Sequence, residues 1–365
     1  MGVENAPCPA PADTAPLGWT RLFDTELLFT HGAESLLKRI APLPLALLWV
    51  AVLSACPQAG AHPAAAVSQP LSEAWWTGPL LAPNAATLPP GHLYLEPYLY
   101  DAMPYARFDA RGRSRPTAFQ HAFGSLTYMS YGLTPRVTIG LIPRFGYLQS
   151  SSGASSASIG LGDLTVQAQY RLSAPDPHSG MPIASINLQE SLPTGRYQRL
   201  HRLSDGFGSG AFTTTVSAYL MAYYWLPTGR ILRTRLDLSY AISSEVPLAG
   251  LSVYGTPAGF HGRAYPGNSA YADLGLEYSM TRNWVLACDL WAQQDASTRV
   301  LGTVTTSAAQ TFTRVARRGF LLYVAPALEY NWSARLGVIF GIRVAAAGRN
   351  ETATLTPIAA LSYFH

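Results

Sequence analysis

The chain has 365 residues, of which 48% are hydrophobic and only 13% are charged, and its formal net charge is +4. That charge is small and scattered, with no basic stripe or nucleic-acid motif, which argues against nucleic acid as a partner. No apolar run reaches the ~20 residues that a spanning helix needs, so a membrane protein with this sequence requires a closed β-barrel.

Residues 1–61 are predicted to be an N-terminal extension and a secretory signal peptide. Lys38 and Arg39 precede a short apolar stretch over 40–55, and small residues follow up to Ala61. This order is typical of an export signal cleaved after Ala61. The alternative is a lipobox-like LSAC sequence, which would make Cys56 a lipidated first residue. A start codon assigned too early would explain the long leader.

Residues 62–90 are rich in alanine and proline, and their proline content argues against regular structure. This segment is expected to hang in the periplasm or to fold into the barrel mouth as a small plug. Of the three cysteines, Cys8 and Cys56 precede it, which leaves Cys288 alone in the barrel region and excludes a disulfide framework there. Alternation with Leu286 and Leu290 predicts that Cys288 faces lipid.

Alternating apolar and polar residues recur from residue 91 to the C-terminus. Successive side chains of a strand point to opposite faces, so each such segment has one polar and one apolar face. The clearest case is GLGDLTVQAQYRL at 160–172. Twelve segments are predicted to be strands: Gly91–Ala102, Ala118–Leu133, Val137–Gln149, Gly160–Leu172, Met181–Leu192, Ala211–Leu226, Arg230–Ser243, Ala270–Met280, Trp284–Asp295, Gly319–Tyr330, Leu336–Ala347 and Thr352–Phe364.

The connections between these strands alternate between short turns and mostly longer loops. Bacterial barrels have even strand numbers, short periplasmic turns and longer external loops. Residues 91–365 are therefore predicted to form one all-β domain. It is a single 12-stranded antiparallel transmembrane β-barrel with up-and-down topology, with both termini periplasmic, in the bacterial outer membrane. A soluble β-sandwich also has alternating strands, but its Greek-key connections would break this regular order. The predicted external loops include Met103–Thr117, Ser150–Ile159, Pro193–Gly210, Ser244–Ser269, Thr298–Arg318 and Gly348–Glu351.

Charged residues on the polar faces are predicted to line the lumen. Such residues either pair across neighbouring strands or tune the selectivity of a pore. Twelve strands lie between the filled eight-stranded barrel and the open barrel of sixteen or more, so we expect a narrow or gated passage. The predicted lumen-lining residues are Glu96, Arg144, Asp163, Arg171, Arg233, Arg235, Asp237, Asp273, Glu277, Asp289, Glu329 and Arg343.

Three stretches carry a family resemblance. GLGDLTVQAQYRL at 160–172, followed by LPTGR at 192–196 and GFGSGA at 206–211, resembles the outer-membrane family named for the MetA pathway of phenol degradation. TGPLLAPNAATLPPGHLYLEPYLYD at 77–101 is similar to the start of that group. The resemblance covers roughly Trp75 to His365. It implies a single barrel that passes small, often hydrophobic, compounds, and it supplies no catalytic or ligand-binding residues.

The sequence therefore predicts a channel or transporter for small hydrophobic or aromatic molecules. The alternative is a non-transporting barrel with an adhesion or structural role through its long external loops. We expect no enzyme, cofactor or metal site, because neither His201, Ser204 and Asp205 nor His121 and Ser125 form a recognised catalytic motif. The expected partners are outer-membrane lipid, the barrel-assembly machinery and a small-molecule solute.

Overall fold

The computed structural model describes residues 68–151, 153–173, 181–305 and 309–365. The predicted signal peptide and both predicted processing sites, Ala61 and Cys56, lie outside the described residues. Within those ranges, no helix is long and apolar enough to cross a bilayer. The described part of the chain contains two single-turn 3-10 helices, η2 (Leu71–Glu73) and η3 (Leu203–Asp205).

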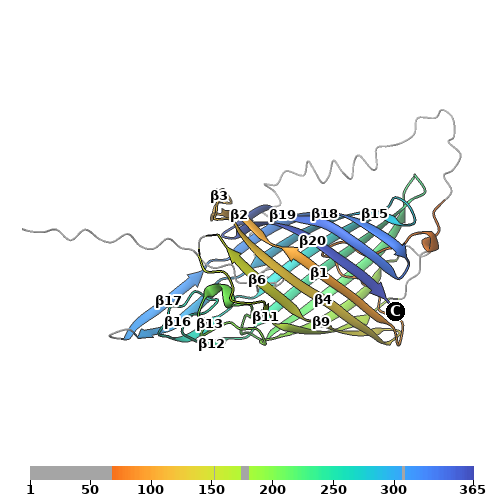
Figure 1. Cartoon of the computed structure of the whole chain (residues 1–365). Helices are drawn as coiled ribbons and strands as arrows, with labels where there is room; N and C mark the ends of the chain where they lie inside the picture. Colours follow the sequence, from red (N-terminus) through yellow and green to blue (C-terminus); the bar gives the residue numbers. More distant parts are fainter. Residues whose placement is uncertain (1–67, 152, 174–180, 306–308) are drawn as a thin grey trace, which may run out of the picture.

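The strands form a closed antiparallel barrel (Figure 1). The first wall strand pairs with its successor and also with the last strand, which closes the sheet. The predicted 12-stranded barrel is thereby confirmed. Around the wall the order is β1 (Leu93–Asp101), β4 (Gln120–Thr134), β5 (Val137–Ile142) with β6 (Arg144–Ser150), β8 (Leu164–Arg171), β9 (Ile183–Leu192), β10 (Thr213–Trp225), β11 (Ile231–Ser243), β14 (Ser269–Ser279), β15 (Trp284–Asp295), β18 (Gly319–Ser333), β19 (Leu336–Arg349) and β20 (Thr352–Phe364).

The two faces of the wall are inverted relative to a water-soluble barrel. Apolar side chains are exposed on the outside, among them Leu99, Ile139, Leu188, Val216, Leu238, Leu286, Phe340 and Leu361. Polar side chains are buried on the inside, among them Thr165, Ser185, Asn187, Thr215, Ser217, Arg235, Asp273 and Glu329. An apolar outer face is favourable in lipid. The alternation in the sequence therefore corresponds to the lipid-facing and lumen-facing sides of an outer-membrane barrel.

Two predicted strands are each broken in the structure. The strand predicted at Val137–Gln149 is divided into β5 and β6 at Pro143, which has no N–H to donate to a ladder. The strand predicted at Gly160–Leu172 is divided into β7 (Gly160–Leu161) and β8, because residues 162 and 163 leave the ladder. The two breaks are adjacent, since β6 pairs with β7 while β5 pairs with β8.

The predicted loop Met103–Thr117 is wrong in part, because it contains two strands. β2 (Met103–Phe108) pairs with β20 and continues the wall beyond β1. β3 (Ser114–Pro116) pairs back onto β2 as a short hairpin. The sequence ARFDARGRSRP lacks a regular apolar face beyond Phe108, so the alternation criterion did not detect this hairpin.

The predicted loops Ser244–Ser269 and Thr298–Arg318 are also wrong, because they contain four strands. β12 (Val246–Ala249), β13 (Phe260–Tyr265), β16 (Thr298–Thr305) and β17 (Ala309–Ala316) form a second antiparallel sheet, here called the extracellular sheet. Its pairing of β12 with β13 keeps the register of β11 with β14. Its other ladders likewise keep the registers of β14–β15 and β15–β18. Four wall strands therefore continue past the barrel (Figure 1).

The extracellular sheet has a core of its own, in which Phe260 is fully buried between Val246, Leu248, Ala264 and Val300. Phe260→Ala removes this ring, which we expect to cost about 3–5 kcal/mol of local stability. Limited trypsin digestion should then cleave the variant within the extracellular sheet. The barrel itself should remain folded, which heat-modifiable migration on a denaturing gel would show.

A matched control for this experiment is Phe340→Ala, which removes an exposed ring from the lipid-facing wall. That variant should keep the cleavage pattern of the unmodified protein. Equal cleavage of both variants would show that the extracellular sheet does not depend on its own core.

Candidate functional site

The lumen holds the chain segment that precedes β1. This N-terminal segment, residues 68–92, begins at the rim formed by the short turns. There the amide of Gln69 donates to the Gly229 carbonyl (2.8 Å) and the amide of Trp75 donates to the Arg282 carbonyl (3.1 Å). Both acceptors belong to turns between wall strands, so the segment starts at the periplasmic end of the barrel.

Beyond this rim, the segment is anchored to Glu329 of β18. One carboxylate oxygen, Oε2, accepts from the amides of Thr77 (2.7 Å) and Gly78 (3.2 Å). The neighbouring Trp76 ring lies under the guanidinium of Arg233, 4.4 Å from its Cζ. The chain is thus held through backbone amides at a buried carboxylate and through a cation–π contact.

The second anchor, deeper in the barrel, is Asp289 of β15. Its Oδ2 accepts from the amide of Leu80 (2.9 Å), and its Oδ1 accepts from the amide of Ala82 (3.1 Å). Arg235 donates from Nη1 to the Ala82 carbonyl (3.0 Å). Donors and acceptors of this irregular backbone are therefore satisfied by charged side chains of the wall.

The arginines at these anchors share one carboxylate, that of Glu277 on β14. Arg233 donates from Nε to Glu277 Oε2 (2.7 Å) and from Nη2 to Oε1, while Arg235 Nε lies 3.1 Å from Oε2. All three side chains are buried. Glu277 therefore fixes the direction of both guanidinium groups that contact the N-terminal segment.

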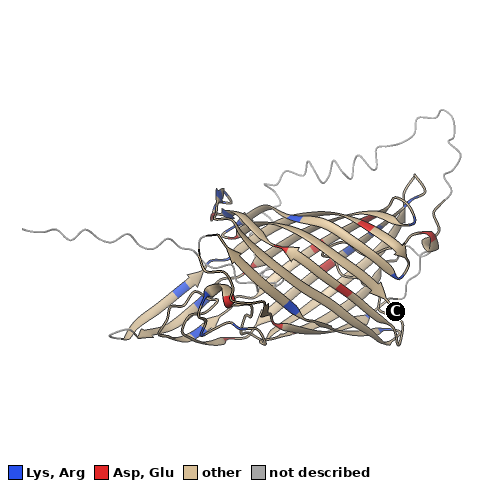
Figure 2. Cartoon of the chain, in the orientation of Figure 1, with Lys and Arg blue, Asp and Glu red and all other residues tan. Residues whose placement is uncertain are grey.

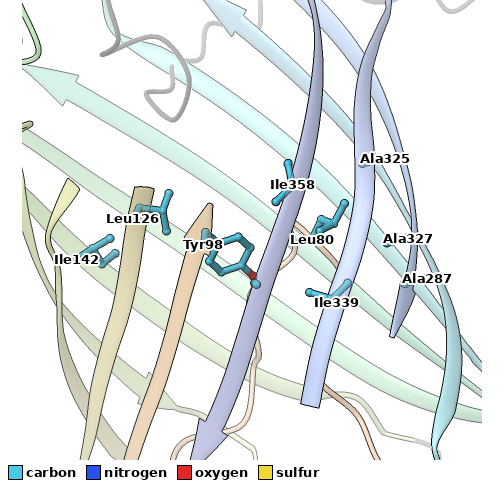
Figure 3. Packing of buried hydrophobic residues seen from close by; sticks show 10 residues of the cluster. Leu80, Tyr98, Leu126, Ile142, Ala287, Ala325, Ala327, Ile339 and Ile358 are labelled. Carbon is cyan, nitrogen blue, oxygen red and sulfur yellow. The ribbon is translucent and has the colours of Figure 1, made fainter. Parts of the chain in front are cut away.

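Leu80 of the segment is buried among wall side chains that include Tyr98, Ile339 and Ile358 (Figure 3). The wall has a glycine at the point of contact. A Cβ atom added to Gly341 would lie 2.5 Å from Leu80 Cδ1 and 2.6 Å from the Pro326 carbonyl oxygen, so a larger residue there would crowd both the segment and the wall backbone.

The segment then returns to the periplasmic rim before β1 begins. Gln169 Nε2 donates to the Asn84 carbonyl (2.9 Å), and the amide of Leu88 donates to Thr138 Oγ1 (2.8 Å). Gly91 follows in a left-handed conformation, with φ +80°. The segment is thus an arch with both ends at one rim.

A cavity of about 450 Å³ lies between this arch and the wall. Its lining extends from the turn residues Ala334 and Arg335 to Trp291 and Arg343 deeper in the barrel. Aromatic side chains of the wall border it beside polar and charged ones, among them Tyr94, Tyr98, Tyr100, Tyr128, Tyr219, Tyr271 and Trp291. The cavity therefore combines ring faces with hydroxyl groups.

An arginine between aromatic rings bounds the inner end of the cavity. The Arg343 guanidinium lies 4.8 Å from the Tyr323 ring and 5.4 Å from the Trp291 ring. The two rings are themselves in contact, with centroids 5.2 Å apart. Phe108 of β2 and other buried apolar side chains pack around these rings. The cavity therefore ends at an arginine that lies between two packed rings.

Two carboxylates face each other across neighbouring strands in the cavity wall. Asp237 of β11 pairs in register with Asp273 of β14, and both are buried. Ser239 donates to Asp237 Oδ1 (2.6 Å), whereas Asp273 Oδ1 has no hydrogen-bond partner among the described residues. Like charges directly opposite each other disfavour a ladder, so this pair is unusual as a purely structural feature.

The predicted lumen residues fall into four groups. Those that border the cavity are Glu96, Arg144, Arg233, Arg235, Asp237, Asp273 and Arg343. Glu277, Asp289 and Glu329 are fully buried beneath the N-terminal segment. Arg171 is half-buried near the turn end and borders neither the cavity nor the N-terminal segment. Asp163 holds an external loop, since it accepts from the amides of Gly195 (2.9 Å) and Ser209 (2.6 Å).

The aromatic lining was absent from the predicted site. Tyr94, Tyr98 and Tyr100 share the strand face of Glu96, and Tyr271 shares that of Asp273, so the same alternation would have identified them. Residues 76–84 and 86–88 of the N-terminal segment also line the cavity, but their sequence shows no such alternation.

The residues considered for catalysis hold loops instead: Ser204 Oγ donates to the Ala154 carbonyl (2.7 Å) and Asp205 Oδ1 accepts from the amide of Ala157 (2.8 Å).

The second pair considered for catalysis, His121 and Ser125, lies on β4. His121 Nδ1 is 2.6 Å from Asp101 Oδ2, and its ring stacks on Phe123 at 5.4 Å. These contacts join β1 to β4 near the extracellular end. They do not bring a serine to the histidine.

One solved structure supports the barrel fold. An outer membrane channel from Pseudomonas putida F1 aligns with a TM-score of 0.61 and 16% identity, over 78% of this chain and 100% of that chain. Weaker alignments include a TodX monoaromatic hydrocarbon channel mutant (TM-score 0.36, 13% identity, 76% of this chain and 90% of that one). The translocator domain of the autotransporter NalP from Neisseria meningitidis aligns similarly (TM-score 0.38, 10% identity, 75% and 88%). No curated protein matches the sequence significantly.

The sequence itself matches a family model. The family is described as "Putative MetA-pathway of phenol degradation", and the match spans residues 114–356, from β3 into β20. It includes the strands that carry Asp237, Asp273 and Asp289. The resemblance at residues 160–211 is confirmed by this match: the chain belongs to the MetA-pathway phenol-degradation family, as an outer-membrane β-barrel.

Proposed function

We propose that the protein is an outer-membrane channel for small aromatic and other hydrophobic solutes, and that its N-terminal segment gates the passage. The observation that carries the proposal is the tyrosine- and tryptophan-lined cavity of about 450 Å³ within a closed barrel. Its volume is in the range of small-molecule sites, which span roughly 300–1,000 Å³. Ring faces favour aromatic solutes, and a narrow passage excludes large polar ones.

Uptake by intact cells tests this function. Cells that express the protein should take up radiolabelled toluene and phenol faster than cells without it, while glucose uptake should be unchanged. Trp291→Ala, which removes a ring from the inner end of the cavity, should reduce the preference for aromatic solutes. Equal uptake of all three solutes with and without the protein would contradict the proposal.

Asp273 is expected to favour solutes that carry a hydroxyl group. Asp273 borders the cavity and its Oδ1 atom is buried without a hydrogen-bond partner among the described residues, so we expect a phenolic hydroxyl that enters beside it to donate to it. A hydrogen bond to a charged group contributes about 1.5–3 kcal/mol. Asp273→Asn should therefore lower the affinity for phenol relative to toluene by roughly tenfold or more, measured by calorimetry on the purified barrel.

Asp237→Asn is the matched control for Asp273→Asn, because Asp237 already accepts from Ser239. That variant should keep most of the preference for phenol. A preference that survives Asp273→Asn, or that falls equally in both variants, would exclude Asp273 as the selective contact.

A second function, adhesion, is favoured by one observation. The extracellular sheet is a folded element with its own core, and it exposes apolar side chains such as Leu301 and Val315. Exposed apolar groups on a rigid scaffold suit attachment to another surface. Deleting residues 299–315 should abolish attachment while solute uptake remains, if adhesion is the role of this sheet.

A further inference from the structure

The extracellular end of the barrel carries a cluster of exposed arginines, here called the basic rim. They come from three neighbouring connections, namely the β2–β3 hairpin, the β17–β18 connection and the β19–β20 turn. Figure 2 shows positive charge gathered on the β2–β3 hairpin. The members of the basic rim are Arg107, Arg111, Arg113, Arg115, Arg317, Arg318 and Arg349.

The three connections are joined by hydrogen bonds. The amide of Phe108 donates to the Glu351 carbonyl (2.8 Å), and the amide of Asn350 donates to the Asp109 carbonyl (3.3 Å). Asn350 Nδ2 donates to the Arg318 carbonyl (2.8 Å). These bonds hold the backbone of the basic rim as one unit, so its arginines are presented at fixed positions.

The Asp109 carboxylate offsets part of this charge, since it also lies 3.8 Å from Arg115 Nη2. Asp109 Oδ1 accepts from the amides of Arg111 (2.8 Å) and Arg113 (3.0 Å), and its Oδ2 accepts from Arg113 Nε (3.1 Å). Its carboxylate is thus used within the hairpin turn. Glu351 is buried, with its carboxylate packed against Gly319. The outer surface keeps a concentration of like charges whose repulsion a bound anion would relieve.

The basic rim begins where the apolar outer face ends. On β2, exposed Tyr105 is followed on the same face by exposed Arg107. On β19, exposed Phe340 and Ile342 are followed nearer the extracellular end by Arg349. The guanidinium groups therefore lie next to the end of the apolar outer face, where the headgroup region of an outer membrane is expected to begin.

We propose that the basic rim binds the phosphate groups of a phosphorylated glycolipid in the outer leaflet of the outer membrane. Guanidinium groups bind phosphate oxygens through paired N–H donors, and the described residues contain arginine but no lysine. The apolar wall below the rim would contact the acyl chains of the same molecule. The rim therefore selects an anion that is anchored in the membrane.

Binding of purified lipid A tests the proposal. The full-length protein, in phosphatidylcholine nanodiscs, is titrated with bis-phosphorylated lipid A and with its dephosphorylated form. The unmodified protein should bind the phosphorylated form more tightly, with an affinity that falls as salt is added. The triple variant Arg107→Gln, Arg111→Gln and Arg115→Gln should bind it roughly tenfold more weakly or worse.

The triple variant keeps Arg113, so the turn around Asp109 retains its donors. If this variant does not fold, Arg317→Gln with Arg318→Gln tests the opposite side of the rim and should also weaken binding. The control is Arg263→Gln with Arg299→Gln, which removes two exposed arginines from the extracellular sheet. That control should bind lipid A like the unmodified protein.

Several results would overturn the proposal. Equal affinity for phosphorylated and dephosphorylated lipid A would exclude phosphate recognition. Equal weakening by the control variant would indicate a general charge effect. Effective competition by inorganic pyrophosphate would point to a site for soluble anions, and equally tight binding of polyglutamate would point to an acidic protein as the partner.

Discussion

Replacing both Asp289 and Glu329 by alanine is expected to raise single-channel conductance roughly tenfold, because the lumen of a 12-stranded barrel is wide enough for water once the N-terminal segment leaves. The two carboxylates accept four backbone amides of the segment. A buried amide that loses its acceptor costs about 1–3 kcal/mol, and hydration outside the barrel removes that cost. Planar-bilayer recordings of the purified protein measure the change.

Asp163→Ala is the control for this variant. Asp163 is a buried carboxylate that also accepts several hydrogen bonds, but those bonds come from an external loop. Its loss should leave the conductance near that of the unmodified protein. Two results together would contradict the anchoring role: unchanged conductance of the double variant, and a cysteine at position 85 that stays unreactive to maleimide when Cys8, Cys56 and Cys288 are replaced by serine.

Glu277→Gln is expected to destabilise the barrel by about 3–5 kcal/mol, because it leaves Arg233 and Arg235 buried without a counter-charge. Both guanidinium groups bond to this one carboxylate, and all three side chains are excluded from solvent. Urea unfolding followed by tryptophan fluorescence measures the loss. Adding Arg233→Gln should recover part of it, since one unpaired charge is then removed.

The control for Glu277→Gln is Glu73→Gln. Glu73 lies 3.5 Å from Arg282, and both side chains are half exposed at the periplasmic rim. Surface pairs of this kind contribute less than about 1 kcal/mol. A loss of stability that is the same for both variants, or costs of Glu277→Gln and Arg233→Gln that simply add, would show that the buried pair is not a coupled unit.

The barrel could be predicted from the sequence because each wall strand has lipid on one side and polar groups on the other. This contrast gives the period-two pattern seen, for example, in Arg233, Arg235 and Asp237 against Leu236 and Leu238. The extracellular sheet lacks that contrast. Its strands have a small apolar core on one face and a mixture of threonine, arginine and apolar residues such as Leu301 on the other, so they resembled polar loops.

The lumen could be predicted only in part, for a different physical reason. Alternation identifies which side chains face inward, but not what fills the space between them. Asp289 and Glu329 bind backbone amides of the N-terminal segment. Every residue except proline has such an amide, so residue types do not reveal these contacts. Asp163 has the same alternation as the cavity residues, yet the strand break beside it turns it toward the loop at Gly195.

The position of Gly91 has a consequence for how the molecule is assembled. The segment before it enters and leaves through the same opening, and β1 begins immediately afterwards by pairing with the end of β20. Among the described residues, from 68 onward, no stretch of the chain is threaded through the closed ring. The ring of wall strands can therefore close first and receive the arch afterwards. Late insertion of the arch requires no wall strand to separate from its neighbour.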